Sequence, residues 1–142
     1  MTNALVVGDL QSGITRNYPF ARNLVPVVSE ILPTARAAGV LIVFVRTALR
    51  VNGLDVAPTN PLITACHAAG DIFHQGSPGA EVDPALGIAD GDAVVTKRRG
   101  SAFTGTELDM VLRGRGVGSP AVAGVATSAM VAATVYDALD RD

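Results

Sequence analysis

Four short runs of apolar, largely β-branched residues constrain the fold of this 142-residue chain more than any other feature. They lie at residues 4–8, 40–46, 93–96 and 121–124. Unbroken apolar runs of this length are typical of parallel strands covered on both faces. Between the first two runs, apolar residues recur at helical spacing from Leu24 to Ala35. This order predicts a strand–helix–strand unit with the right-handed connection of parallel sheets.

The remaining segments continue the same pattern. Helices are predicted near residues 106–115 and from about Ser128 to Leu139, after the third and fourth runs. Residues 47–92 show little periodicity apart from a short helix at 62–69, and we interpret them as a lid or a subunit contact, because long irregular segments in compact domains are usually functional. We therefore expect one domain over residues 1–142, with a three-layer α/β/α, Rossmann-like fold and a mostly parallel sheet.

Two local features concern the first helical region. The polar stretch from Gln11 to Pro19 contains a glycine and is interpreted as a loop. Pro33 lies inside the predicted helix, where it removes a backbone hydrogen bond and should produce a kink.

Composition argues against several classes of function. The formal net charge is -2, and the basic cluster at residues 97–99 is too short to follow a nucleic-acid backbone. No apolar run approaches the roughly 20 residues that span a bilayer, and the N-terminus lacks the basic region of a secretory signal. The single cysteine, Cys66, excludes an intrachain disulfide. We expect a cytoplasmic protein with no nucleic-acid or membrane partner.

Two charged residues follow predicted strands directly. Asp9 comes after the first run, and Lys97, the only lysine beside ten arginines, ends the third. Ligands bind at the carboxyl edge of open parallel sheets, because loops and helix N-termini converge there. This placement predicts a site built from Asp9 and Lys97. The alternative is that Lys97 is only a solvated strand end in a chain that disfavours lysine.

Four segments in this order resemble the isochorismatase-like (cysteine hydrolase) family. They are Val7-Gly8-Asp9-Leu10-Gln11, Gly76 to Val82, Thr96-Lys97-Arg98-Arg99-Gly100-Ser101-Ala102-Phe103, and Ala123-Gly124-Val125-Ala126-Thr127-Ser128-Ala129-Met130-Val131. The resemblance covers essentially the whole chain. It implies a triad of Asp, Lys and Cys, in which Asp9 and Lys97 take the first two positions. The nucleophile position falls on Met130, whose thioether cannot form a thioester. Cys66, in the middle of the irregular segment, is a poor substitute.

Loss of the cysteine does not remove every activity that the resemblance implies. Isochorismatases proper work without that cysteine and hydrolyse a vinyl ether, which needs a proton donor and water rather than a covalent nucleophile. We expect a hydrolase of a small anionic molecule, with Asp9 as general acid and Lys97 as electrostatic partner. Lys97 should lower the pKa of Asp9 while burial should raise it, and the sequence leaves the balance open. The alternative is an inactive family member that serves as a ligand-binding or assembly subunit.

The resemblance also implies an anion-binding turn after the last strand. A cis peptide between Val125 and Ala126 would let the backbone N–H groups of Ala126 and Met130 point at the substrate from a helix N-terminus. An ordinary turn capped by Thr127 or Ser128 is the alternative. Side chains that we expect to contact the substrate are Gln11, Phe20, Phe103 and Thr127, although either phenylalanine could belong to the core.

The sequence lacks the common metal-binding motifs and the C-terminal elements of the family. The chain has no CxxC or HxxxH pattern, and His67 and His74 lack the Asp-x-His motif of the nicotinamidase branch, so we expect no metal and no other cofactor. The chain stops at Asp142, where the last predicted helix ends, whereas family members continue. Either the chain is truncated or another subunit covers that face, and we expect a homo-oligomer.

Overall fold

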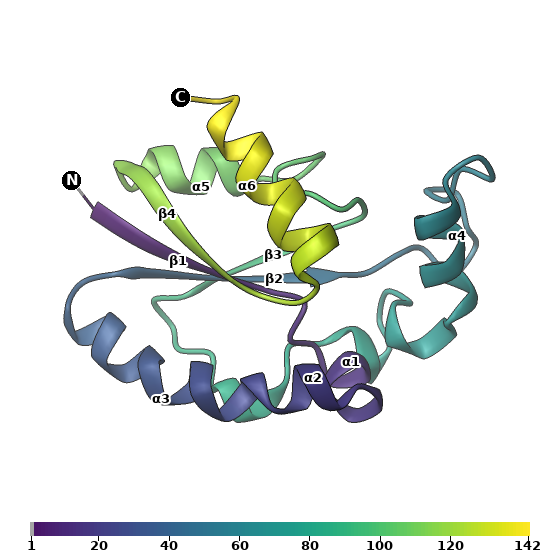
Figure 1. Ribbon diagram of the computed structural model, residues 1–142, viewed down its shortest axis with the longest axis horizontal. Coiled ribbons are helices and arrows are strands. Elements are labelled where there is room, and N and C mark those ends of the chain that lie inside the picture. The colour runs from purple at the N-terminus through teal and green to yellow at the C-terminus, as the bar shows by residue number, and fades with distance from the viewer. Residues whose placement is uncertain (1) are drawn as a thin grey trace.

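The computed structural model describes residues 2–142, which form a four-stranded sheet between two layers of helices (Figure 1). The strands are β1 (Thr2–Gly8), β2 (Leu41–Thr47), β3 (Ala93–Lys97) and β4 (Val117–Gly124). They are all parallel and follow the order β3-β2-β1-β4. All four strands were predicted, but β4 begins four residues earlier than its apolar run. The extra residues include Pro120, which an edge strand tolerates.

Helices cover both faces of the sheet, as predicted. On one side lie α1 (Ser12–Asn17), α2 (Pro19–Arg22) and α3 (Leu24–Ala37), and on the other lie α5 (Leu108–Gly114) and α6 (Ala132–Leu139) (Figure 1). A π-helical turn, η4 (Thr127–Val131), leads from β4 into α6. The three-layer α/β/α architecture is therefore confirmed.

Two apolar cores separate these layers because successive strand residues point to opposite faces. Val7, Ile42 and Phe44 pack toward α3. Val6 and Val43, their neighbours in the strands, pack toward α5. The two central strands, β1 and β2, are thus buried from both sides, which explains why their sequences are apolar without alternation.

The prediction of a loop from Gln11 to Pro19 is wrong, since most of this stretch lies in α1 and in the first turn of α2. A helix of six residues is too short to show periodicity, and its polar residues Ser12 and Thr15 are buried. Gly13 allows the close approach of this helix to Ile72, because a Cβ there would lie 2.7 Å from the Ile72 Cα. Pro33 does not end α3, which continues to Ala37.

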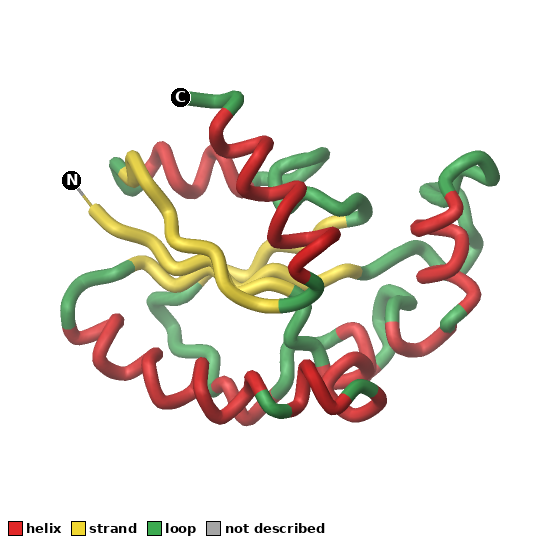
Figure 2. Tube along the Cα trace, viewed as in Figure 1, coloured by secondary structure: helices red, strands yellow, loops and turns green. Residues whose placement is uncertain are grey.

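Residues 48–92 contribute no strand to the sheet and are only partly irregular (Figure 2). They contain the predicted short helix, α4 (Pro61–Ala68), and three 3-10 turns, η1 (Gly70–Ile72), η2 (Pro78–Ala80) and η3 (Pro84–Leu86). α4 lies beyond the carboxyl ends of β1, β2 and β3 (Figure 1). Among residues 2–142, no helix is long and apolar enough to cross a membrane.

Candidate active site

Asp9 stands at the carboxyl end of β1 in an unusual backbone conformation. Its φ angle is 57°, in the left-handed region that non-glycine residues seldom adopt. The Asp9 N–H donates to the Val45 carbonyl at 2.8 Å, which ties the turn to the neighbouring strand. The residue is 8% exposed. A non-glycine residue held in this region is a frequent feature of functional sites.

Asp9 and Lys97 meet at the carboxyl edge of the sheet, with Lys97 Nζ 3.0 Å from Asp9 Oδ2. Their strands are not neighbours, because β2 lies between β1 and β3. Thr47, at the end of β2, bridges the gap. Its hydroxyl donates to Asp9 Oδ1 at 3.1 Å and accepts from Lys97 Nζ at 2.7 Å. Sequence reasoning missed Thr47, although a hydroxyl at the end of the intervening strand was a usable signal.

This buried pair answers the question that the sequence left open for Asp9. Burial raises the pKa of the Asp9 carboxyl, and this effect outweighs the lowering by the Lys97 ammonium and by the hydrogen bonds from Lys97 and Thr47. A carboxyl with a raised pKa holds its proton to higher pH than an exposed aspartic acid. A shift in this direction is the one that general-acid chemistry requires.

Gln11 supports the site from behind rather than lining it. Its amide oxygen accepts from the Thr47 N–H at 2.8 Å, and its amide nitrogen donates to the carbonyls of Thr47 and Ile72 at 3.0 and 2.6 Å. The side chain is fully buried and is not part of the cavity wall. The expected substrate contact of Gln11 thus becomes a positioning contact, because backbone groups of β2 and η1 occupy its amide.

A cavity of about 300 Å³ opens above the pair. The charged and hydroxyl groups of its wall come from five residues. They are Asp9, Tyr18, Thr47, Lys97 and Arg99. The remaining wall is mostly apolar and comes from α1, α2, α4 and the turn after β4. A mainly apolar cavity with a few convergent polar groups is the usual form of a small-molecule site.

The turn after β4 contains the cis peptide bond that the resemblance implied. The Val125–Ala126 peptide is cis, and both Ala126 and Met130 line the cavity. Met130 is buried, and a Cβ on Gly8 would lie 1.2 Å from the Met130 Cε. The methionine methyl therefore packs directly over the last residue of β1.

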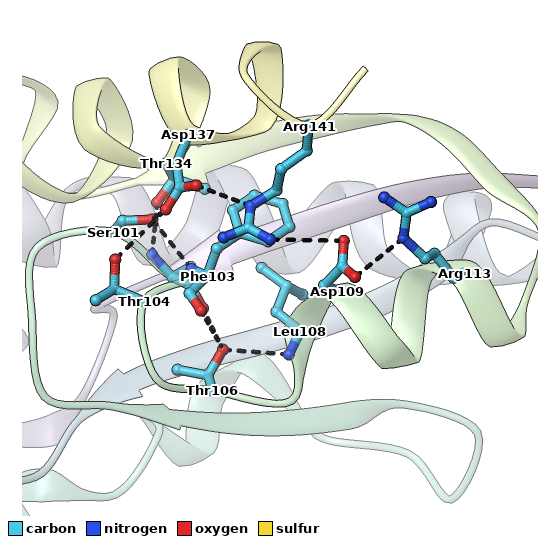
Figure 3. A network of polar contacts seen from close by, with 11 residues as sticks. Ser101, Phe103, Thr104, Thr106, Leu108, Asp109, Arg113, Thr134, Asp137 and Arg141 are labelled. Carbon is cyan, nitrogen blue, oxygen red and sulfur yellow. Dashed lines mark hydrogen bonds and ion pairs between the residues drawn. The ribbon is translucent and has the colours of Figure 1, made fainter.

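The segment after Lys97 fastens α6, and hence Met130, to the sheet. The Ala102 N–H donates to Thr134 Oγ1 at 2.9 Å, and that hydroxyl lies 3.7 Å from Met130 Sδ. Figure 3 shows the adjoining contacts, in which Ser101 Oγ donates to Asp137 Oδ2 at 2.7 Å. The serine and alanine of this motif therefore hold the helix in place.

Two further expected substrate contacts, besides Gln11, lie away from the cavity wall. Phe103 is buried in the core on the α5 side, beneath the Arg141 guanidinium at 4.8 Å from the ring centre (Figure 3). The alternative assignment of Phe103 to the core is the one that the structure supports. Thr127 is exposed and is not part of the wall either. Phe20 does line the cavity and stacks on Tyr18 at 5.6 Å.

A profile of the isochorismatase domain matches residues 3–142. The chain belongs to the isochorismatase family. It is 35% identical over 137 residues to YwoC of Bacillus subtilis, an uncharacterized isochorismatase family protein, and 27% identical over 131 residues to an N-carbamoylsarcosine amidase of an Arthrobacter species. It is also 30% identical over 145 residues to an Arabidopsis thaliana protein named as a probable inactive nicotinamidase.

Solved structures of the same family share the fold. A cysteine hydrolase from Pseudomonas syringae matches 98% of this chain with a TM-score of 0.86 and 28% identity, and an isochorismatase family protein from Desulfovibrio vulgaris matches 99% with a TM-score of 0.84 and 34% identity. The chain spans 66% and 76% of those two structures. The matches to the Bacillus, Arthrobacter and Arabidopsis proteins include 95%, 92% and 98% of this chain. They include 69%, 50% and 74% of those three proteins, in the same order.

Cys66 lies closer to the site than the sequence indicated. It belongs to α4 and lines the cavity that holds Asp9 and Lys97. Burial raises the pKa of the Cys66 thiol, Lys97 opposes this shift, and Asp9 adds to it. A thiol with a raised pKa is mostly protonated at neutral pH and is a weak nucleophile.

The two histidines pack against each other beside α4. The ring centres of His67 and His74 are 4.8 Å apart, and their Nε2 atoms lie 3.2 and 3.0 Å from the carbonyl oxygens of Val51 and His67. Among residues 2–142, no three His, Cys, Asp or Glu side chains gather as a metal site would require.

Proposed function

We propose that this isochorismatase-family chain hydrolyses a vinyl-ether bond in a small anionic molecule, with Asp9 as general acid and without a covalent nucleophile. The observation that carries the proposal is the buried Asp9 carboxyl, whose pKa is raised and whose position is fixed by Lys97 and Thr47. Cavity, acid and cation all lie at the sheet edge where ligands of parallel α/β folds bind.

The reaction needs one proton donor and one water molecule. Asp9 gives its proton to the terminal carbon of the enol ether, and the π electrons form the new C–H bond. The resulting oxocarbenium ion adds water at the ether-bearing carbon and loses a proton to the Asp9 carboxylate. The hemiketal then breaks its C–O bond and releases a ketone and an alcohol. Asp9 is protonated again at the end of the cycle.

Lys97 acts on the charge that Asp9 acquires. Once the proton has left, the carboxylate lies 3.0 Å from the ammonium and still accepts the Thr47 hydroxyl. Both contacts are stronger with the carboxylate than with the neutral acid, so they favour the state after proton transfer. Gln11 keeps Thr47 in place for this role.

The turn at Ala126 and Met130 is proposed to hold a polar oxygen of the substrate through backbone N–H groups. Met130 takes the position of the family cysteine in this proposal. Its thioether has no ionisable proton, so no thioester intermediate can form at that position.

The test is turnover against matched panels of vinyl-ether carboxylates and amides. We expect hydrolysis of vinyl ethers and none of amides. Asp9→Asn should lower vinyl-ether turnover by about 10²–10⁴-fold, the usual contribution of a general acid, and circular dichroism verifies that the variant is folded. Turnover of amides by the wild-type protein, or full vinyl-ether activity in Asp9→Asn, would refute the proposal.

A second candidate is a ligand-binding subunit without catalysis. The buried Met130 side chain packed on Gly8 favours it, since a methionine fills the place of the family nucleophile with inert volume. The name of the Arabidopsis relative is consistent with such members of the family. Tight ligand binding without turnover of either panel would support this candidate.

A further inference from the structure

Lys97 has no hydrogen-bond donor left for a substrate anion. Its ammonium contacts Asp9 Oδ2 at 3.0 Å, Thr47 Oγ1 at 2.7 Å and the Arg99 carbonyl at 3.1 Å. An ammonium carries three N–H groups, so these three contacts occupy all of them. A negatively charged substrate in this cavity therefore needs another cation.

Arg99 is the other cationic residue of the cavity wall. Its Nη1 donates to the carbonyls of Asp55 and Arg98 at 3.0 and 2.5 Å, which anchors one side of the guanidinium fork. Among residues 2–142 no carboxylate forms an ion pair with Arg99, and no acceptor bonds its Nε or Nη2.

The preceding arginine provides a contrast on the same strand end. Arg98 pairs with Asp55 at 2.8 Å, bonds Gln75 at 3.0 Å, and is not part of the cavity wall. One arginine of the pair is thus committed to holding the loop at Asp55. The other keeps an uncompensated charge at the cavity.

The rest of the cavity indicates what such a charge would bind. The three Lys97 donors are all occupied, so among residues 2–142 Arg99 is the one cation of the wall that keeps unbonded N–H groups. Most other lining residues are apolar, among them Ile14, Ile63, Phe73 and Val125. A small apolar volume beside one free guanidinium fork suits a ligand with an apolar body and a single planar anion, because the fork matches the two oxygens of a carboxylate.

We propose that Arg99 binds the carboxylate of the substrate, and that the substrate is a small monocarboxylate with an apolar or ring-shaped body. This assignment rests on the proposed function in placing the substrate above Asp9, but it concerns binding rather than bond cleavage. Arg99 is then the residue that selects acids over their neutral analogues.

The test compares two probes of nearly equal shape, benzoate and benzamide, by isothermal titration calorimetry. Wild-type protein should bind benzoate about tenfold or more tightly, since a hydrogen-bonded ion pair to a charged group contributes on this scale. Arg99→Met should remove the preference. Arg115→Met, which deletes an exposed arginine after α5, should retain it and controls for net charge. Circular dichroism verifies that each variant is folded.

A second measurement needs no variant. Benzoate, but not benzamide, should protect Arg99 of the wild-type protein from phenylglyoxal, as read by peptide mass spectrometry. Equal binding of the two probes, no binding of either at millimolar concentration, or a preference that survives Arg99→Met would overturn the assignment. A benzoate preference without vinyl-ether turnover would refute the proposed function and leave Arg99 as an anion site. Vinyl-ether turnover that depends on Asp9 but not on Arg99 would support the proposed function and refute the assignment of Arg99.

Discussion

The cavity floor has a polar half and an apolar half. At the ends of β1, β2 and β3, the buried polar groups of Asp9, Thr47 and Lys97 hold one another at 2.7–3.1 Å. At the end of β4, Met130 fills the floor with an apolar side chain that packs on Gly8. The first half carries ionisable groups, whereas the thioether of the second half has no ionisable proton.

The largest expected effect comes from breaking the polar half. Lys97→Met leaves Asp9 buried without its cation, and removal of one partner of a buried pair typically destabilises by about 3–5 kcal/mol. Because the folded-state pKa of Asp9 is already raised, it should rise further, and stability should be lost as pH increases from the ordinary range near 4 through that pKa. Urea unfolding between pH 4 and 8 measures this. Asp9→Asn in the same background should remove the pH dependence, and a pH-independent loss would contradict the account.

A smaller effect is expected where the two halves touch. Gly8→Ala places a Cβ within 1.2 Å of the Met130 Cε, and overpacking of this kind typically costs about 1–3 kcal/mol. Met130→Ala should relieve it, so Gly8→Ala should cost less in that background. Chemical denaturation of the four proteins of this cycle gives the coupling energy. Purely additive effects would mean that Met130 does not occupy the space above Gly8.

A thiol introduced at residue 130 tests the apolar half of the cavity floor by chemical labelling. In a Cys66→Ala background, Met130→Cys should react with iodoacetamide in the folded state, because residue 130 lines the cavity. Its thiol pKa should lie below about 8.5, since the helix N-terminus and Lys97 favour the thiolate. The lost volume should lower stability by about 1–2 kcal/mol. A thiol that reacts only after unfolding would place residue 130 in the core, away from the site.

The smallest effect is expected at the native cysteine. Cys66→Ala should leave vinyl-ether kcat/KM within about twofold, because the raised pKa of the thiol keeps it protonated. Alkylation is the poorer test, since an adduct on a cavity-lining thiol blocks the site whatever its role. Loss of activity in Cys66→Ala that Cys66→Ser restores would show that the polar group of residue 66 takes part in turnover.

Sequence patterns predicted the parts of the site that follow strands. Asp9 and Lys97 come directly after long apolar runs, and parallel strands bring such positions to one edge. Thr47 escaped notice because the pattern gives strands without their order, and its importance comes from β2 lying between β1 and β3. The same pattern could not show that Gln11 faces the backbone of β2, or that Phe103 lies on the α5 side.

The irregular segment limited sequence reasoning for a different reason. Residues 47–92 fold by contacts with distant parts of the chain, such as the bridges from Leu49 to His74 and from Gln11 to Val82. Such contacts leave no local periodicity. The placement of Cys66 over the cavity, and the pairing of the Asp55 carboxylate with Arg98 rather than Arg99, therefore emerged only from the structure.

The protonation of Asp9 is the central claim and can be measured directly by a ¹³C NMR titration of the carboxyl carbons. Comparison with Asp9→Asn assigns the Asp9 signal. We expect a midpoint above the ordinary value of about 3.9, because the effect of burial on the Asp9 pKa outweighs that of Lys97. A midpoint at or below that value would mean that the ion pair dominates, that Asp9 is charged at working pH, and that it cannot be the proton donor.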